Sequence, residues 1–323
     1  MPSSCTVKKE KILIGISECL LGRKVRFNGG HQHNRYITDT LGKYFRFQAY
    51  CPEIAIGLGV PRAPIRLVGN AKHPRAIGTK DNNLDVTDKL KDYGQTVANS
   101  LPTEMCGFIV KSKSPSCGME RVKVYHVNGN PNTHSRGLFT AELLKQNPNL
   151  PIEEEGRLTD PVLRENFIER VFLLYRWKSQ FTKGLTAKGL LEFHTKNKLS
   201  LMAHHPLSYK ELGNLLANLK EKPIDEIADE YFSKLMCAFT YKATIVKITN
   251  VLQHCAGHLK KQLDSFDKQE LANIIQRYYQ NEIPLIVPIT LLQHYFRKYP
   301  DPYIKQQTFL SPYPQELRLR STV

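Results

Sequence analysis

The sequence predicts two domains of different fold class: an α/β N-terminal domain with a mainly parallel sheet over residues 1–155, and an all-α C-terminal domain over residues 156–323. A chain of 323 residues exceeds the usual size of one hydrophobic core. Before residue 150, short strand-like runs alternate with helical patterns, whereas only helical periodicity follows. Between them, residues 146–158 contain two prolines and an acidic cluster without periodicity, which favours a domain boundary.

The N-terminal half contains three strand-like segments. Residues 11–17 form an apolar run typical of a buried strand, residues 44–50 alternate between apolar and polar side chains, and residues 106–112 supply the third segment. Residues 34–43 can hold a short helix between the first two, and Asp85 precedes a longer helical pattern. This alternation predicts βαβ units, whose strands run parallel.

The C-terminal half has the signals of helices only. Thr159 is a plausible N-cap with Pro161 in the first helical turn. Ser208 and Glu211 fit a capping box, in which each side chain satisfies a free backbone N–H of the helix start. Residues 224–262 continue as one long helical pattern, with a possible break near Gly257.

Composition indicates a cytoplasmic protein without a membrane span. Apolar residues make up 41% of the chain and charged residues 24%, as in ordinary globular proteins. No apolar run approaches the roughly eighteen residues that a span requires, and the N-terminus lacks a hydrophobic signal core. Seven cysteines, an odd number spread over the chain, argue against a disulfide framework and leave reduced thiols or metal ligands.

The basic charge favours a polyanionic partner. The net charge is +16 and the pI is about 9.5. Residues 1–155 contain 22 basic and 14 acidic side chains and the remainder contains 24 and 16, so each half carries +8. An excess of this size is typical of nucleic-acid binding, although some basic proteins bind no nucleic acid.

Three cysteines form the strongest candidate site. Cys19, Cys51 and Cys117 each follow the C-terminal end of one of the three predicted strands. Ligands of open α/β sheets bind at that edge, so thiols that are distant in sequence can meet there. Three thiolates at one site indicate a soft metal or a cluster, and a cluster with only three cysteine ligands leaves one iron open to substrate.

Two other interpretations of these cysteines stay open. They could be unrelated buried residues, since cysteine packs well in cores, and Cys106 at the start of a strand is interpreted in that way. They could also hold a structural zinc ion, which prefers thiolate ligands. No C-x-x-C pair occurs, which weakens both the zinc-ribbon interpretation and the compact cluster motifs.

Five separated segments resemble the thiouracil desulfidase family. They are Cys19-Leu-Leu-Gly22, Arg26-Phe-Asn-Gly-Gly30, Cys51-Pro-Glu53, Pro61-Arg62 and Ser114-Pro-Ser-Cys-Gly118. The rest of the chain, from Gly156-Arg-Leu through the segment 163–170 to the C-terminus, is similar to an all-helical domain that occurs fused to this family. Together the two resemblances extend over nearly the whole sequence.

The resemblance implies a [4Fe-4S] cluster bound by Cys19, Cys51 and Cys117, and a reaction that converts 4-thiouridine in tRNA to uridine. It assigns Glu53 to the carboxylate that activates water and Ser114 to the assisting serine. Independently of the resemblance, the reaction is chemically reasonable, because a Lewis-acidic metal bound to the sulfur of a C=S group makes the carbon of that group easier to attack. Glu53 could instead be a helix-start carboxylate that faces backbone N–H groups.

Further candidates for substrate contact are small or polar residues near these positions: Asn28, Gly29, Gly30, Arg62, Ser112 and Ser116. The glycines could offer backbone N–H groups to a phosphate, or they could only form a turn. Arg62 fits either a substrate contact or a structural ion pair. The serines share one loop, and each could be a turn residue.

The C-terminal half interleaves basic and aromatic residues, a pattern that can bind RNA phosphates and stack on bases. The stripes are 175–178, 193–198, 241–242, Lys247 and 277–279. Core aromatics beside a charged face would give the same pattern. His204 and His205 are expected in a polar loop near RNA, and the pair His254 and His258 is a weak metal candidate.

The expected partner is tRNA, with no sign of an obligate protein partner. A base inside folded tRNA must be turned out to reach a buried cluster. Two alternatives remain: a desulfidase of free thiouracil bases, and a non-catalytic RNA-binding protein with a structural three-cysteine zinc site.

Overall fold

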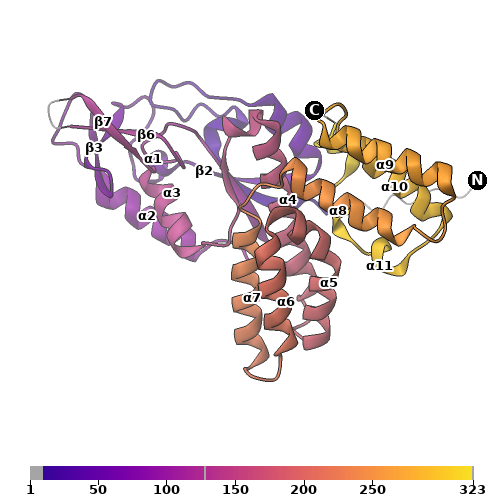
Figure 1. Ribbon diagram of the computed structural model, residues 1–323. Coiled ribbons are helices and arrows are strands. Elements are labelled where there is room, and N and C mark those ends of the chain that lie inside the picture. The colour runs from indigo at the N-terminus through magenta and orange to yellow at the C-terminus, as the bar shows by residue number, and fades with distance from the viewer. Residues whose placement is uncertain (1–9, 127–128, 322–323) are drawn as a thin grey trace, which may run out of the picture. The chain divides into compact units, whose positions relative to one another are not determined.

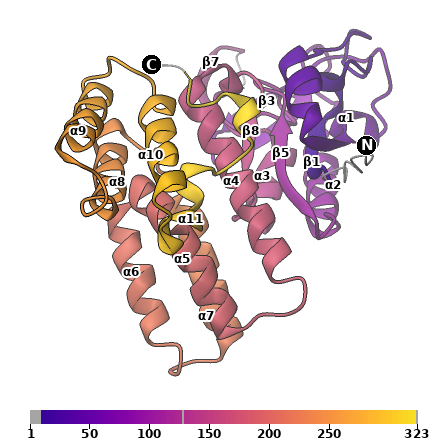
Figure 2. The same ribbon diagram turned by 90° about the vertical axis from the view of Figure 1, so that its right-hand side faces the viewer.

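The computed structural model describes residues 10–126 and 129–321, and its chain divides into two compact units between Thr159 and Asp160 (Figures 1 and 2). Within the described residues, every strand belongs to the first unit and the second is helical. This confirms the predicted fold class. The boundary predicted from composition, after residue 155, falls a few residues earlier than the one observed.

The first unit contains a four-stranded parallel sheet in the order β2-β1-β5-β8. Its strands are β1 (Ile12–Ser17), β2 (Phe45–Tyr50), β5 (Met105–Val110) and β8 (Ile152–Glu154). Every residue of β1 and β5 is buried, which explains why both are continuous apolar runs in the sequence. Because all four strands run parallel, their C-terminal ends meet at one edge.

A second four-stranded sheet was not expected from the sequence. Its order is β4-β3-β6-β7, with antiparallel pairs at both edges and a parallel pair in the centre. The strands are β3 (Ile65–Asn70), β4 (His73–Gly78), β6 (Val122–Tyr125) and β7 (Pro131–Ser135). A small apolar core that includes Leu67, Ala76 and Val124 lies against it.

Helices of the first unit connect the strands: η1 (Glu18–Leu21), η2 (Tyr36–Thr40), η3 (Leu41–Lys43), α1 (Pro52–Ala55), α2 (Thr87–Asn99), α3 (Leu138–Gln146) and η4 (Arg157–Thr159). Thus the helix expected over residues 34–43 is a π-helical turn followed by a 3-10 turn. Rings from different elements pack together, with Phe139 of α3 5.7 Å from Tyr93 and 6.0 Å from Phe108 between centroids. These contacts fix α2 and α3 beside the parallel sheet.

The acidic stretch of the predicted boundary region belongs largely to the parallel sheet. Glu153, Glu154 and Glu155 are all less than 10% exposed, and the first two belong to β8. Three adjacent glutamates look like solvated loop residues in a sequence. Here their carboxylates accept hydrogen bonds from nearby backbone and side-chain donors, which offsets the cost of burial.

The second unit contains the helices α4 (Pro161–Gln180), α5 (Ala187–His204), α6 (Pro206–Ala217), α7 (Ile224–Ala238), α8 (Ile245–His258), α9 (Ser265–Tyr279), α10 (Ile286–Lys298) and α11 (Pro302–Lys305), and the short turns η5 (Thr308–Leu310) and η6 (Gln315–Leu317). The long pattern over residues 224–262 is two helices, broken between Ala238 and Ile245 and not at Gly257. No helix among the described residues is long and apolar enough to cross a membrane.

Two helix starts differ from the predicted ones. Asp160 caps α4 through its carboxylate, whereas Thr159 donates its hydroxyl to the carbonyl of Gly156. Helix α6 begins at Pro206, so Ser208 lies inside its first turn and His205 is the cap. In both cases a proline at the first helical position sets the start, because its fixed φ angle suits that position.

Candidate active site

Cys19, Cys51 and Cys117 line one cavity of about 330 Å³ in the first unit. Cys19 lies in the 3-10 turn after β1, Cys51 directly precedes α1 after β2, and Cys117 follows the loop after β5. The parallel order of β2, β1 and β5 brings these three segments to one edge of the sheet. The sequence placed the three thiols correctly with respect to the ends of the strands.

The loop that carries Cys117 is held by its own backbone and by α3. The hydroxyl of Ser114 accepts hydrogen bonds from the backbone N–H groups of Ser116 and Cys117 at 3.3 and 3.1 Å. Thr140 donates its hydroxyl to the carbonyl of Cys117 at 2.6 Å. A Cβ added to Gly137 would lie 2.5 Å from the carbonyl oxygen of Ser116, so the loop approaches the start of α3 as only glycine allows.

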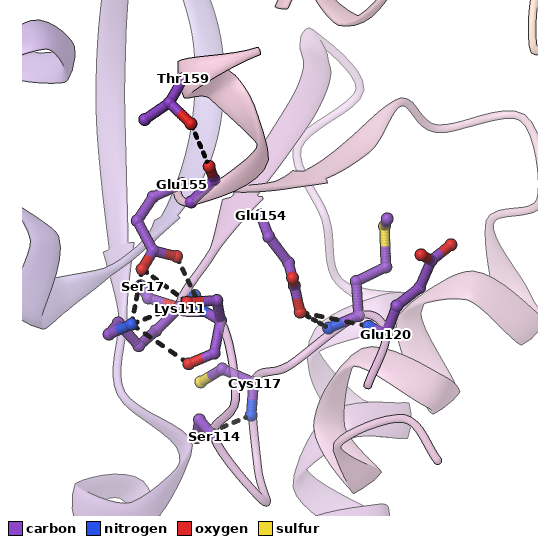
Figure 3. Close-up of polar contacts among 11 residues, drawn as sticks. Ser17, Lys111, Ser114, Cys117, Glu120, Glu154, Glu155 and Thr159 are labelled. Atoms are coloured by element: carbon purple, nitrogen blue, oxygen red, sulfur yellow. Dashed lines mark hydrogen bonds and ion pairs between the residues drawn. The ribbon is translucent and has the colours of Figure 1, made fainter. Parts of the chain in front are cut away.

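Two consecutive glutamates hold both ends of the same loop, as Figure 3 shows. Glu155 accepts hydrogen bonds from the backbone N–H of Ser112 at 2.6 Å and from its hydroxyl at 2.8 Å, and it forms an ion pair with Lys111. Glu154 accepts from the N–H groups of Met119 and Glu120 at 2.8 and 3.1 Å. Glu154 is the last residue of β8 and Glu155 begins the turn that follows, and their carboxylates reach opposite ends of the loop.

Burial is the main cause that raises the pKa of all three thiols, that of Cys19 to about 11. Charge repulsion from Cys51 acts in the same direction on Cys19 and Cys117, as expected for thiols that line one cavity. Metal binding requires thiolates, so a metal centre here would displace protons from the site.

The donor set fits a cluster better than a single ion. Within residues 10–126 and 129–321, no three His, Cys, Asp or Glu side chains converge as one bound metal ion requires. A zinc ion holds its thiolates about 2.3 Å from one point. In a cluster each thiolate binds a different iron, so its ligands surround a cavity without converging. Three cysteines that line a 330 Å³ cavity match the second arrangement.

Glu53 lies in the wall of this cavity with both carboxylate oxygens engaged. Ser116 donates its hydroxyl to Oε1 at 2.9 Å, and Arg62 Nη2 lies 2.7 Å from Oε2. The side chains of Arg62 and Glu53 are 6% and 16% exposed, so the pair is shielded from solvent. The interpretation of Glu53 as a carboxylate facing helix-start N–H groups therefore has no support in its contacts. Arg62 is an ion-pair partner that also lines the cavity.

The other predicted contact residues divide into two groups. Ser112 and Ser114 line the cavity. Ser116, which was expected to contact substrate, is fully buried and bonds to Glu53, so it positions the carboxylate instead. The turn residues Asn28, Gly29 and Gly30 are not among the residues that line the cavity. Asn28 Oδ1 accepts the N–H of Gly30 at 3.1 Å, and Gly29 has a φ of 73°, as the turn interpretation requires.

Sequence reasoning missed the residues that organise the site. Lys111 and Arg26 line the cavity, Ser17 accepts the backbone N–H of Lys111 at 2.9 Å, and Glu155 binds the side chain of Lys111. The position of Lys111 directly after a buried strand was an available signal. The role of Glu155 had none, because its partners lie more than forty residues earlier in the chain.

The six aromatics of the stripes divide equally between the interior and the surface of the second unit. Trp177 stacks on Phe232 at 4.6 Å between centroids, and Phe193 and Tyr278 are buried. Tyr175, Tyr241 and Tyr279 are exposed large side chains. Core packing therefore accounts for half of the pattern, and the exposed half is compatible with the predicted RNA contacts.

The histidines of the second unit also differ from expectation. His204 is 3% exposed and pairs with Glu169 in the interior, so it cannot contact RNA in this conformation. His205 stacks on Tyr241 at 4.4 Å between centroids. His258 bonds to Asp301 at 2.9 Å, and with His254 it forms no metal group among the described residues.

Comparison with known proteins agrees with the site. A family model described as 2-thiouracil desulfurase matches residues 14–155. The uncharacterized protein YbgA of Escherichia coli (strain K12) is 30% identical over 152 residues, which cover 47% of this chain and 90% of that protein. The uncharacterized protein YbbK of Bacillus subtilis (strain 168) is 30% identical over 139 residues, which cover 42% of this chain and 90% of that protein. The chain belongs to the 2-thiouracil desulfurase family.

This desulfurase family member carries a second matched region in its helical unit. A model described as a protein of unknown function (DUF1722) matches residues 198–314. A solved structure described as a [4Fe-4S]-dependent thiouracil desulfidase, TudS, is 29% identical, covering 47% of this chain and 95% of that one, with a TM-score of 0.37.

Proposed function

We propose that this desulfurase family member converts 4-thiouridine in tRNA to uridine and releases sulfide, using a [4Fe-4S] cluster held by Cys19, Cys51 and Cys117, with the cytoplasm as its compartment. The observation that carries the proposal is the cavity that three thiols from three strand ends line together with the partly buried carboxylate of Glu53. The net reaction replaces the sulfur of the base with the oxygen of water and needs no oxidant or reductant.

A cluster bound by three cysteines supplies one iron with an open position for the sulfur of the substrate, where a Lewis acid makes the adjoining carbon more electrophilic. The chain's own residues supply the remaining chemistry. Each oxygen of Glu53 can accept more than one hydrogen bond, so this carboxylate can bind a water molecule while it remains bonded to Ser116 and Arg62. As a general base it removes a proton from that water, whose oxygen then adds to the ring carbon.

Ser114 and the basic residues act on the substrate side. The hydroxyl of Ser114 accepts two backbone hydrogen bonds and can still donate its proton to the base. Arg26, Lys111 and Lys113 line the cavity and offset negative charge on the departing sulfide. The fixed positions of Ser114 and Lys111 in the clamped loop reduce the reorganisation that the reaction requires.

An RNA substrate is supported by charge. The chain carries +16, and its first 155 residues carry half of this excess. A buried cavity can accept the base of an RNA only when the nucleotide turns out of its stack, which costs a few kcal/mol and must be offset by contacts to the backbone. Free thiobases need no such contacts and are the alternative substrate.

The decisive experiment incubates anaerobically reconstituted protein with 4-thiouridine-containing tRNA and follows the absorbance of the thiobase. We expect loss of the thiobase and release of sulfide with wild type, and none with Cys19→Ser. Cys106→Ser is the matched control, because Cys106 is buried in β5 and does not line the cavity. An unchanged thiobase signal with a full cluster would refute the assigned reaction. Equal kcat/KM for free 4-thiouracil would indicate the free-base enzyme.

A further inference from the structure

A second concavity, of about 810 Å³, lies in the first unit and is open to solvent. Part of its lining directly follows the Cys117 loop in the sequence. It is lined by the turn after β3, by α2 and α3, by the end of β7 and by the residues that follow Cys117, which are grouped at one end of the unit (Figure 1). We call it the basic groove and define it by its cations: Lys72, Lys91, Arg121, Arg136 and Lys145.

Four of the five cations of the basic groove lack a carboxylate partner among the described residues. Among the described residues, Lys72, Lys91, Arg121 and Arg136 form no ion pair within 4.0 Å, and Lys145 has one contact at 3.9 Å. One of the two glutamates in the lining, Glu120, is itself paired with an arginine outside the groove. The groove therefore presents uncompensated positive charge.

Elsewhere in this unit, Arg23, Arg46 and Arg75 each contact a carboxylate within 3.1 Å, whereas the exposed Arg35 has no ion pair among the described residues. The basic groove is distinguished by the gathering of five cations on one concave surface. A concave surface with one sign of charge concentrates oppositely charged ligands.

Among the described residues, the lining contains no phenylalanine, tyrosine or tryptophan, and its aromatic rings are those of His73 and His134. Proteins that stack on bases use aromatic rings, whereas lysine and arginine alone contact phosphates without reading the sequence. The chemistry of the groove thus fits a phosphodiester backbone and not a free base or an apolar peptide.

The basic groove is connected to the cysteine cavity through a rigid segment. Arg121 follows Cys117 by four residues, so their Cα atoms are at most about 14 Å apart. Glu154 holds the backbone between them through two N–H groups. On the other wall, Arg136 precedes Gly137, whose N–H donates to the carbonyl of Gly118 at 2.7 Å.

We propose that the basic groove binds the phosphate backbone of the RNA strand whose thiobase enters the cysteine cavity. This inference rests on the proposed function and assigns backbone binding to the α/β unit itself. Because Arg121 lies at most about 14 Å from Cys117, the basic groove can contact phosphates close to the nucleotide whose base enters the cysteine cavity. The contacts compensate for unstacking and are independent of the neighbouring bases.

The test uses the triple variant Lys91→Gln/Arg121→Gln/Arg136→Gln in the full chain with its cluster. The matched control is Arg35→Gln/Lys43→Gln/Lys80→Gln, which removes three exposed, unpaired cations of the same unit outside the groove. Affinity for 4-thiouridine tRNA, and for single-stranded RNAs of different sequence, is measured as a function of salt concentration.

We expect the salt dependence of binding to be weaker in the groove variant, with the magnitude of the slope of log K against log salt reduced by about 2. Three phosphate contacts are removed, and each contributes about 0.7 in a single strand. At about 0.1 M salt this corresponds to roughly 100-fold weaker binding, equal for all sequences. The control variant should stay within a few fold of wild type. The iron content and the cluster absorbance of the groove variant should equal those of wild type, which verifies its fold and cluster.

Binding by the groove variant that matches the control would overturn the inference, as would a loss restricted to particular sequences. Failure of the proposed function gives a different result. If wild type leaves thiolated tRNA intact but binds RNA with the groove-dependent slope, the desulfidase assignment to tRNA is wrong and the groove assignment holds. If wild type desulfurates tRNA and the groove variant does so with the same KM, only the groove assignment is wrong.

Discussion

Replacing Glu169 with glutamine tests the electrostatics of the helical unit. Oε2 of Glu169 lies 3.2 Å from Nε2 of His204, and the two side chains are 5% and 3% exposed. Burial alone would raise the pKa of Glu169. The interactions with His204, and with Arg320 and Arg176 at longer range, favour the charged form more strongly and lower the pKa to about 2, from an ordinary value of 4.5.

A carboxylate whose pKa is lower in the folded state stabilises the protein above the unfolded-state pKa, and this stabilisation is lost as the pH falls toward 2. One pKa unit corresponds to about 1.4 kcal/mol, so the charged form of Glu169 contributes about 3 kcal/mol at pH 7 and about 1 kcal/mol at pH 3.

Thermal unfolding followed by tryptophan fluorescence measures this effect. The single tryptophan, Trp177, belongs to α4 and reports the helical unit. For a unit of this size, 3 kcal/mol lowers the midpoint by roughly 6–12 °C, so Glu169→Gln should show such a decrease at pH 7 and about a third of it at pH 3. Glu192→Gln, which removes an exposed carboxylate, should change little. Equal decreases for Glu169→Gln at both pH values would refute the reasoning.

Three substitutions test the candidate active site. Ser116→Ala removes the hydroxyl that bonds to Glu53 and should lower kcat about 10-fold, the equivalent of about 1.4 kcal/mol, with the iron content unchanged; a wild-type kcat would contradict the positioning role. Gly137→Ala places a Cβ against the Cys117 loop and should reduce the iron retained per chain, whereas Gly213→Ala, which has open space, should retain it fully. Glu155→Gln weakens one end of the clamp and should accelerate the loss of cluster absorbance in a chelator; an unchanged half-life would show that the clamp does not hold the ligand loop.

The strands with a clear apolar run or alternation were predictable, and those with an irregular pattern were not. Residues 12–16 and 105–110 carry no charged or polar side chain, which few structures other than a central parallel strand accommodate. The second sheet escaped notice because its strands are interrupted by proline, glycine and charged residues. β8 was missed for a different reason: its glutamates are buried only because donors from the Cys117 loop satisfy them.

The candidate site divides in the same way. The positions of Cys19, Cys51 and Cys117 after strands, and of Glu53 after Cys51, follow from local sequence, since a parallel sheet aligns the ends of its strands. Which serine would bond to Glu53 did not follow, because Ser116 and Glu53 are 63 residues apart and both donor geometry and burial depend on the packing of α3 against the loop.

Local pattern thus specified three strands of the parallel sheet, the helical character of the second unit and the positions of the thiols, because periodicity and strand ends are properties of short segments. The partners of the polar groups are determined only by the tertiary structure, which pairs Arg62 with Glu53, Lys111 with Glu155, and His204 with Glu169. A hydrogen bond requires two groups within about 3 Å. Segments far apart in sequence reach that distance only when the whole core has packed.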